Sequence, residues 1–322
     1  MEERNVGKSG LRVGSVGLGC NNFGWTLDEE TSRKVIARAL DLGATLFDTA
    51  PRYGKEGGES ESILGEALGD RRKDVVIITK FGVPLGTVGG PFNTSRAVIL
   101  ESVEASLQRL RTDYIDIYML HWPDPKTPLE ETLRALDDLV TAGKVRYIGC
   151  SNLPAWRLVE SKWISRTERL HGFIVAQNEY SILSRHPDSD LIPALVEYGV
   201  GFIPYSPLAN GLLTGKYSRR APPPPESRLG KNLWKLGDRL LTEEKLSIVE
   251  ALDEFARARG HKLIELATSW LLARPTVCSV IAGATRPEQV EQNLAAGEWR
   301  LSADELAEID RICRGPGGKG AS

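Results

Sequence analysis

The amino-acid sequence predicts a (β/α)8 TIM barrel, and three observations lead to this α/β fold class. Short apolar runs that indicate buried strands recur near residues 15, 45, 75, 115, 145, 173, 201 and 278. Most gaps between these runs carry apolar residues at the spacing of an amphipathic helix. Strict alternation of strand and helix predicts parallel strands with right-handed crossovers, and eight such units favour a closed barrel over an open sheet.

The length and charge of the chain fit one barrel. A chain of 322 residues is within the usual size of such a barrel, so we expect a single domain over residues 1–314 and a disordered tail over 315–322. The 41 basic and 43 acidic residues leave a net charge of -2 and a pI of about 6.2. This balance offers no broad attraction to nucleic acid or anionic membranes, so neither is expected as a partner. The oligomeric state stays open.

Cysteine spacing and the lack of long apolar stretches indicate a cytoplasmic protein. The four cysteines are far apart and form no C-x-x-C pair, so we expect neither a metal site nor a disulfide framework. Residues 2–5 (EERN) are charged or polar, with no apolar segment after them, and no run of 18 apolar residues occurs. Secretion and membrane spanning are therefore not expected.

The first half of the chain contains three recognisable elements. Residues 4–13, broken by Gly7 and Gly10, predict a hairpin that closes one end of the barrel. Residues 127–130 (TPLE) combine a capping box with a proline at the first helical position. Ser95 precedes another helix. The apolar faces of these two helices are Ile99, Val103, Leu107 and Leu110 in the earlier one and Leu133, Leu136, Leu139 and Val140 in the later one.

The interval between the seventh strand (201–206) and the eighth (278–283) is irregular. Residues 221–225 (APPPP) predict an exposed loop of polyproline character. Helical patterns resume at 242–259 and 263–272. We therefore expect a long loop after strand 7. Capping boxes at residues 285–288 (TRPE) and 302–305 (SADE) predict two late helices, the second an extra C-terminal one.

Four chemically reactive residue types stand at or just after the ends of early strands. The run LFDTAPRYG contains Asp48 and Tyr53, the run VVIITK ends in Lys80, and the run IDIYMLH ends in His121. The carboxyl ends of barrel strands form the active-site face, so we expect these side chains to meet there. For each residue taken alone, a purely structural role is as plausible as a catalytic one. Asp48 and Lys80 could form only a salt bridge, and His121 could be an ordinary core residue.

These residues, in the contexts FDTAPRYG, TKFG and LHWPD, resemble the aldo-keto reductase superfamily in type and order. The resemblance extends from Gly17 to Asn293. The YSPL and GATRPEQ segments look closest to the branch with potassium-channel β subunits and bacterial aldose or pyridoxal oxidoreductases. The resemblance implies reduction of an aldehyde or ketone to an alcohol, or the reverse oxidation, with a nicotinamide dinucleotide bound across the barrel mouth.

The four residues suit that chemistry, which needs a proton donor at the carbonyl oxygen. Tyr53 is the expected donor, and the Lys80 cation is expected to lower the pKa of the phenol from its usual value near 10. Asp48 would hold Lys80 charged, and His121 would donate a hydrogen bond to the carbonyl oxygen. We expect a neutral His121 that orients the substrate.

The cofactor contacts follow from the resemblance, because the sequence has no Rossmann fingerprint: residues 17–24 (GLGCNNFG) have the wrong glycine spacing. Ser151, Asn152 and Gln177 would bind the carboxamide, whose polar atoms need both donors and acceptors. Tyr205 would stack on the nicotinamide ring. Strand-end capping and core packing are the alternative roles.

The late loops resemble the segments that hold the phosphates and the adenosine. Residues 206–216 resemble the pyrophosphate loop, and Arg286 predicts that NADP(H) is preferred over NAD(H). The sequence departs from the family pattern at Asn210 and Gln292, which weakens the expected loop closure and adenine contacts. The expected cofactor contacts are Cys20, Asn21, Asp48, Ser151, Asn152, Gln177, Tyr205, Ser206, Pro207, Leu208, Ala209, Gly211, Lys216, Arg228, Gly283, Thr285, Arg286, Gln289, Gln292 and Asn293.

Aromatic residues on loops at the mouth are candidates for the substrate pocket. Trp25, Phe81, Trp122, Tyr180 and Trp234 would suit apolar or sugar-like carbonyl compounds equally, and buried packing is the alternative for each. Two other function classes are considered. A nucleotide-sensing regulatory protein resembling channel β subunits is disfavoured by the intact set of four residues, and a cofactor-free isomerase or lyase leaves the cofactor-like segments unexplained.

Overall fold

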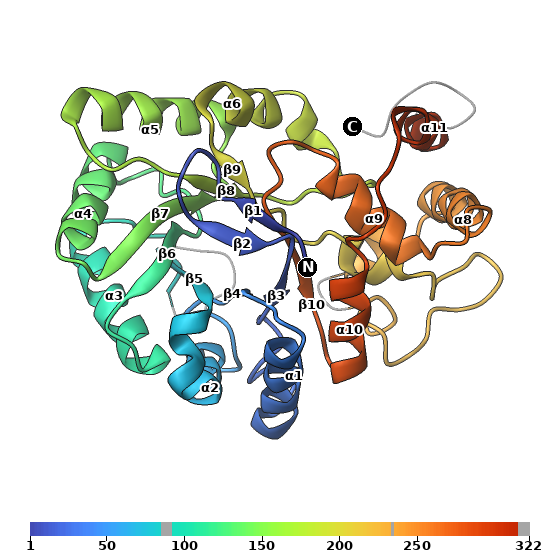
Figure 1. Cartoon of the computed structure of the whole chain (residues 1–322), viewed down its shortest axis with the longest axis horizontal. Helices are drawn as coiled ribbons and strands as arrows, with labels where there is room; N and C mark the ends of the chain where they lie inside the picture. Colours follow the sequence, from blue (N-terminus) through green and yellow to red (C-terminus); the bar gives the residue numbers. More distant parts are fainter. Residues whose placement is uncertain (85–91, 233–234, 315–322) are drawn as a thin grey trace.

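The computed structural model describes residues 1–84, 92–232 and 235–314, and its strands form the predicted barrel (Figure 1). The barrel strands are β3 (Val16–Gly19), β4 (Leu46–Asp48), β5 (Val76–Phe81), β6 (Ile115–Leu120), β7 (Val145–Ser151), β8 (Val175–Gln177), β9 (Gly201–Phe202) and β10 (Val280–Gly283). All pair in parallel, in the order β10-β3-β4-β5-β6-β7-β8-β9. Backbone hydrogen bonds of 2.7 and 2.9 Å join Phe202 to Thr276 and Cys278 and close the sheet.

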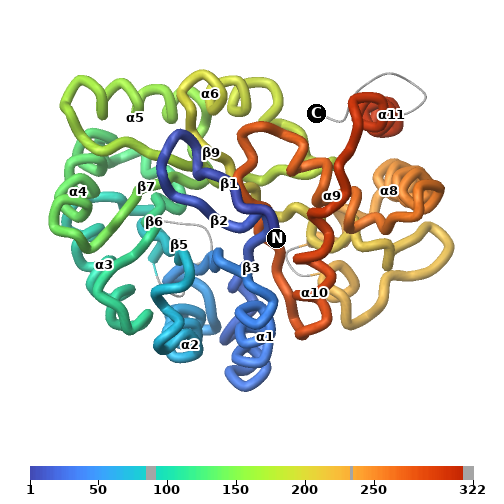
Figure 2. Tube along the Cα trace, in the orientation of Figure 1, coloured from blue at the N-terminus to red at the C-terminus, as the bar shows by residue number. Residues whose placement is uncertain are grey.

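Helices surround the sheet, as Figure 2 shows. Those that follow the strands are α1 (Glu29–Asp41), α2 (Glu59–Leu68), α3 (Arg96–Leu110), α4 (Leu129–Thr141), α5 (Ala155–Glu168), α6 (Leu191–Tyr198), α9 (Leu263–Leu272) and α10 (Pro287–Ala295). The long segment after β9 adds α7 (Leu236–Leu240) and α8 (Glu243–Arg257), and α11 (Ala303–Arg314) ends the described chain. The helices α8 and α11 contact each other beside the ring. The predicted late helices are thus confirmed, while the expected tail and Trp234 lie outside the described residues.

Alternation along each strand divides the core into two layers. The interior of the barrel is lined, in β4 to β6, by Leu46, Val76, Ile78, Ile117 and Met119. Their neighbours Phe47, Ile77 and Tyr118 belong instead to the cluster that packs against the helices. Because a strand changes face at every residue, the residue two positions beyond an interior side chain also points inward.

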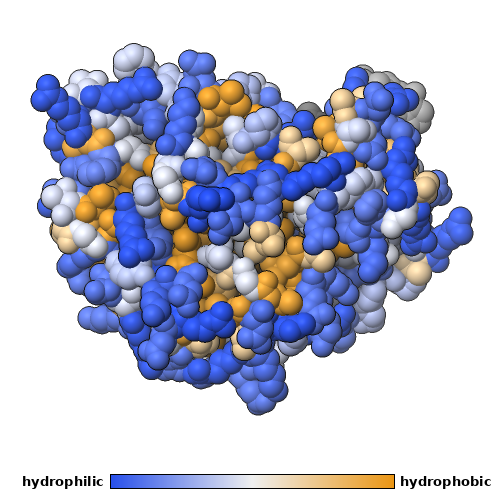
Figure 3. Space-filling view, in the orientation of Figure 1, coloured by the Kyte–Doolittle hydropathy of each residue, from blue (hydrophilic) through white to orange (hydrophobic). Residues whose placement is uncertain are grey.

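The N-terminal hairpin closes the amino end of the barrel, as predicted. Strand β1 (Glu3–Asn5) pairs antiparallel with β2 (Arg12–Gly14). The side chains of Val6 and Val13 are fully buried among the interior residues of the barrel. In Figure 1 the hairpin crosses the front of the barrel, so its carboxyl end faces away from the viewer. Seen from the same side, the outer helices present mostly polar side chains (Figure 3).

Two expected strands are shorter than the apolar runs that predicted them. The seventh pairs regularly with β8 only over β9. On its other side, Pro204 has no N–H to continue the bonds that Phe202 makes with Thr276 and Cys278. Pairing resumes at an isolated bridge between Tyr205 and Glu179. The eighth begins at Val280 rather than at Cys278.

One predicted capping box is confirmed and two are wrong. The N–H of Ser302 donates to Glu305 at 2.7 Å, and the N–H of Glu305 donates to the Ser302 hydroxyl at 3.2 Å. In the box at residues 127–130, the Thr127 hydroxyl donates to Asp124 instead, at 2.7 Å, and α4 begins one residue later than expected.

At residues 285–288 the helix start is also shifted. Arg286 is the N-cap residue of α10, and the side-chain oxygen of Gln289 accepts hydrogen bonds from both the N–H and the hydroxyl of Thr285. Gln289, not Glu288, is therefore the residue whose side chain bonds back to Thr285.

In the described part of the chain, no helix has the length and apolar character needed to cross a membrane.

Close packing of α2 against α3 generates a stability prediction. A Cβ atom at Gly65 of α2 would lie 2.6 Å from the backbone carbon and oxygen of Leu110. Alanine is a better helix former than glycine by about 1 kcal/mol, but overpacking costs about 1–3 kcal/mol. We therefore expect Gly65→Ala to lower the free energy of unfolding, measured by urea denaturation.

Gly10→Ala is the control for this measurement, because no atom lies within 4 Å of the added Cβ. A Gly65→Ala variant more stable than the parent would show that the two helices do not approach as closely as the structure has them.

Candidate active site

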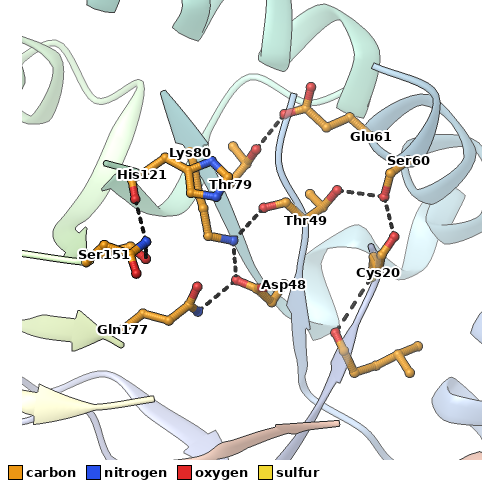
Figure 4. Close-up of polar contacts among 12 residues, drawn as sticks. Cys20, Asp48, Thr49, Ser60, Glu61, Thr79, Lys80, His121, Ser151 and Gln177 are labelled. Carbon is orange, nitrogen blue, oxygen red and sulfur yellow. Dashed lines mark hydrogen bonds and ion pairs between the residues drawn. The ribbon is translucent and has the colours of Figure 1, made fainter. Parts of the chain in front are cut away.

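Asp48, Lys80 and His121 project from the carboxyl ends of neighbouring strands into one region at the barrel mouth (Figure 4). Each lies two residues beyond an interior apolar residue, so the period of the strand turns it inward. The interior residues that precede them are Leu46, Ile78 and Met119. The sequence prediction that these side chains share the mouth is thus confirmed.

Lys80 is the centre of this group, and its side chain is 0 % exposed. Its ammonium donates to Asp48 Oδ1 at 2.7 Å and to the carbonyl of Thr49 at 2.9 Å. Gln177 Nε2 donates to the same Asp48 oxygen at 3.0 Å. Burial alone would lower the pKa of Lys80, but Asp48 and Tyr53 outweigh it and raise that pKa, so the amine is charged at neutral pH.

Tyr53 lies in the loop after β4 and is partly exposed. Its N–H donates to Ala50 at 3.0 Å, and its carbonyl accepts from the N–H of Ser60 at 3.3 Å. The Lys80 ammonium is 5.3 Å from the centre of the phenol ring. The rings of Tyr53 and His121 are 6.0 Å apart at an interplanar angle of 87°. The loop therefore holds the phenol over the lysine and beside the imidazole.

The expected lowering of the Tyr53 pKa is wrong in its net direction. Burial raises the pKa of the phenol, and the Lys80 cation, which acts to lower it, does not outweigh burial. Tyr53 is therefore protonated at neutral pH. The sequence showed the cation but not how far the loop withdraws the ring from water.

His121 is a neutral imidazole in the structure, as expected. Burial, and then the Lys80 and Arg52 cations, lower its pKa well below the usual value near 6.5. A neutral imidazole has one N–H donor, which is what positioning a carbonyl oxygen requires.

Hydrogen bonds join the residues expected at the carboxamide. The Tyr205 hydroxyl donates to Asn152 Oδ1 at 2.9 Å, and Asn152 Nδ2 donates to Ser151 Oγ and to the carbonyl of His121, each at 3.0 Å. Asn152 has a φ of 58°, a left-handed conformation that asparagine tolerates better than most residues. Polar donors and acceptors from β7 and from the segment after β9 thus adjoin the four central residues.

Comparison with known proteins agrees with this geometry. The family model described as "Aldo/keto reductase family" matches residues 15–314. An oxidoreductase of Bacillus subtilis (strain 168) is 35 % identical, over 99 % of this chain and 98 % of its own length. The L-glyceraldehyde 3-phosphate reductase of Escherichia coli (strain K12) is 38 % identical, over 97 % of this chain and 92 % of its own. A probable voltage-gated potassium channel subunit beta of Arabidopsis thaliana is 37 % identical, over 92 % and 91 %.

The chain belongs to the aldo/keto reductase family. The family and the oxidoreductase names of two relatives make it an enzyme of the oxidoreductase class. Among the residues that the structure describes, no group of three or more His, Cys, Asp or Glu could hold a metal ion.

The loop of this aldo/keto reductase that is expected at the pyrophosphate has an unusual backbone. Ser206, Asn210 and Gly211 have φ values of 54°, 56° and 96°. Asn210 departs from the family pattern, and its left-handed backbone conformation explains why asparagine is tolerated at this position. A Cβ atom at Gly211 would lie 3.4 Å from the Lys216 ammonium, so glycine keeps the backbone open beside an exposed cation. The intervening Pro207, Leu208 and Ala209 belong to the same loop.

The segment expected at the adenosine is divided between exposed and buried residues. The side chain of Arg286 is 66 % exposed, and its nearest acidic partner, Glu288, is 3.9 Å away. Gln292 is exposed. Asn293 is buried, and its amide donates to the carbonyl of Gly283 at 3.2 Å, which holds α10 to the end of β10. Its contact with adenine stays a prediction.

Cys20 follows the end of β3, and its backbone N–H donates to the carbonyl of Asp48 at 2.8 Å. Its thiol is fully buried and donates to the carbonyl of Leu18 at 3.6 Å, and burial raises its pKa. Its contact with the cofactor stays a prediction. Asn21 is partly exposed, and its Oδ1 would lie 3.7 Å from a Cβ atom at Gly283.

Of the five aromatic residues considered for the substrate pocket, four are described, and two of these four are buried in the core. Phe81 follows the inward Lys80, so it faces outward, where it packs 4.9 Å from Tyr118. Tyr180 is 0 % exposed and lies 5.1 Å from Trp270. The remaining two, Trp25 and Trp122, are partly exposed.

Arg52 is a residue of this site that the sequence reasoning missed, although it stands inside the FDTAPRYG motif. Its cation acts on the pKa of both Tyr53 and His121, lowering each. Arg228, expected at the cofactor, is electrostatically coupled to Tyr53 as well. The signal that could have identified Arg52 is its place next to Tyr53 in the sequence.

The buried, neutral His121 predicts that stability falls at mildly acidic pH. Its pKa in the folded state is below the unfolded value near 6.5, so its stabilisation is complete above pH about 6.5 and is lost as pH falls toward the folded pKa. We expect this group to reduce the free energy of unfolding by up to about 1.4 kcal/mol per pH unit below that point. Urea denaturation across this range should show a smaller slope in His121→Gln.

His186→Gln is the matched control, because His186 is exposed. The control should keep the dependence of the free energy of unfolding on pH that the parent shows. If His121→Gln kept it as well, the imidazole of His121 could not be buried and neutral as described.

Proposed function

We propose that this aldo/keto reductase uses NADPH to reduce an aldehyde or ketone to an alcohol, or catalyses the reverse oxidation of an alcohol with NADP⁺ as the hydride acceptor. The proposal is carried by the charged, buried Lys80, which Asp48 holds at 2.7 Å beneath the protonated phenol of Tyr53. The name of the Escherichia coli relative, L-glyceraldehyde 3-phosphate reductase, supports the reaction class.

The residues at the mouth fit a nicotinamide dinucleotide. Asn152, Ser151 and Gln177 provide amide and hydroxyl groups near Asp48 and His121, as a carboxamide requires. The left-handed turns of residues 206–211 and the open backbone at Gly211, beside Lys216, suit a phosphate-binding loop. Bound there, the reduced cofactor supplies the hydride.

The residues of the chain manage the proton and the carbonyl oxygen. Neutral His121 donates a hydrogen bond that orients the oxygen, and Tyr53 transfers its phenolic proton to it as negative charge develops. Lys80 stabilises the phenolate that remains, and Asp48 keeps the ammonium in place. The pKa of Tyr53 is raised, so the phenol carries its proton at neutral pH, which is the form that a proton donor needs in the reduction.

A second function, nucleotide sensing without turnover, is suggested by the relative named as a channel subunit. The complete hydrogen-bonded set of Asp48, Lys80 and Gln177 beside Tyr53 favours an active enzyme. Oxidation of NADPH with 4-nitrobenzaldehyde separates the two, since a sensor without turnover would bind NADPH but leave the aldehyde unchanged.

Tyr53→Phe removes one oxygen and should abolish most of the activity. General acid catalysis accelerates a reaction by about 10²- to 10⁴-fold, so we expect the turnover number to decrease by a factor in that range. Fluorescence titration should show NADPH affinity close to that of the parent, because the ring volume is kept. Tyr198→Phe on the outer helix α6 is the control with the same chemical change. Near-parental turnover in Tyr53→Phe would falsify the role of this phenol.

Lys80→Met should act through the same phenol. We expect its loss and that of Tyr53→Phe to be strongly non-additive in the double variant, because residues that act as a unit do not contribute independently. Fully additive losses would indicate that Lys80 serves another step.

Arg286→Ala should remove the preference for NADP(H). The planar guanidinium is largely exposed and held only weakly by Glu288, so it is available for a ribose phosphate. Titration with NADPH and NADH should show the ratio of affinities fall toward one. If the ratio were unchanged while Lys216→Ala lowered it, the phosphate would be read by Lys216.

A further inference from the structure

We propose that Ser60 and Thr49 are positioning residues, which together hold Tyr53 and Lys80 in place relative to each other. The inference rests on the proposed function, in which Tyr53 donates the proton and Lys80 stabilises the phenolate. Both side chains are 0 % exposed, so they act through their neighbours and not on the substrate directly. Their contacts lie behind the lysine in Figure 4.

Thr49 follows the last residue of β4 and binds the lysine through its backbone. Its carbonyl accepts from the buried Lys80 ammonium at 2.9 Å. Its N–H donates to the carbonyl of Ile78 on β5 at 2.8 Å, and its hydroxyl lies 2.9 Å from that of Ser60. Thr49 is therefore held at its N–H and at its side chain, and these two bonds fix the direction in which its carbonyl meets the ammonium.

Ser60 lies in the first turn of α2 and joins three segments of the chain. Its hydroxyl donates to the carbonyl of Cys20 at 2.8 Å. Because a hydroxyl has one hydrogen, the Ser60 oxygen accepts from the Thr49 hydroxyl. Its N–H, one of those that the start of a helix leaves without a partner inside the helix, donates to the carbonyl of Tyr53 at 3.3 Å. Ser60 thus binds both the loop of the proposed proton donor and the residue whose carbonyl holds Lys80.

A closed ring of hydrogen bonds connects this serine to the carboxylate as well. The N–H of Cys20 donates to the carbonyl of Asp48 at 2.8 Å, and the carbonyl of Cys20 accepts from Ser60. The Asp48 side chain in turn accepts from Lys80 at 2.7 Å. The carboxylate and the Thr49 carbonyl that accept from the ammonium therefore belong to one stretch of backbone, which Ser60 holds on two sides.

Thr49→Val tests the inference, because valine has nearly the shape of threonine but no hydroxyl. We expect kcat for 4-nitrobenzaldehyde to fall by about 10-fold or more, since a displacement of about 1 Å can cost about 100-fold in rate. Fluorescence titration should show an affinity for NADPH close to that of the parent. Thr49→Ser, which keeps the hydroxyl, should retain most of kcat.

Thr132→Val is the matched control, because Thr132 on α4 belongs to a similar buried pair of hydroxyls. It is also 0 % exposed, and its hydroxyl donates to the carbonyl of Thr94 at 2.9 Å and lies 3.1 Å from the Thr94 hydroxyl. Both valine variants should lower the free energy of unfolding, but Thr132→Val should keep the kcat of the parent. A parental kcat in Thr49→Val, or an equal loss of kcat in the two variants, would overturn the inference.

Ser60→Ala should lower kcat too, and the double variant with Thr49→Val should lose little more than Ser60→Ala alone. The reason is that residues of one hydrogen-bond network give non-additive losses. Losses that multiply independently would show that the two hydroxyls do not act together, and would overturn their joint assignment. If Ser60→Ala did not fold, Thr49→Val would still decide the inference, because it leaves the bond from Ser60 to Cys20 in place.

If the parent reduced no aldehyde, the proposed function would fail, and the titration of Tyr53 would still decide the inference. The difference in tyrosinate absorbance between each protein and its Tyr53→Phe counterpart isolates this one phenol. The charged groups coupled to it are Asp48, Lys80, Arg52 and Arg228. Because Lys80 acts to lower the pKa of Tyr53, a lysine held less firmly should raise that pKa further in Thr49→Val and Ser60→Ala. An unchanged titration in both variants would overturn the inference.

Discussion

The ion pair between Lys80 and Asp48 is the interaction on which the rest of the mouth depends. A lysine with no exposure to water is tolerated only because a carboxylate lies at 2.7 Å and the Thr49 carbonyl at 2.9 Å. The same ammonium helps keep His121 neutral and opposes the effect of burial on Tyr53. Burial is the larger influence on the pKa of both neighbours, and this one buried charge acts on each of them.

Much of the barrel could be predicted because short stretches of sequence determine where its strands lie and which residues face inward. Apolar runs separated by helical spacing identify parallel strands, and a period of two decides which residues face inward. By that rule Asp48, Lys80 and His121 continue the interior rows of Leu46, Ile78 and Met119. The same rule, applied to the next residue, places Phe81 on the outer face, where the structure has it.

What could not be predicted depends on contacts that the sequence pattern does not show, most of them between segments far apart in the chain. The Thr127 hydroxyl bonds Asp124 rather than capping α4, because a nearby carboxylate competes for it. Tyr180 is enclosed by Trp270, almost one hundred residues later in the sequence. The net pKa of Tyr53 depends on how completely the loop after β4 is covered. None of these follows from residue type or spacing.

The seam of the barrel has a consequence for synthesis on the ribosome. Strand β10 pairs with β3 on one side, and the residues just before it pair with Phe202 on the other. A nascent chain lacking residues 276–283 therefore has two unpaired sheet edges, one on β3 and one on β9. Because a chain emerges from its N-terminus, this sheet stays open until most of the protein has left the exit tunnel. Both edges need protection from pairing with other chains during that interval.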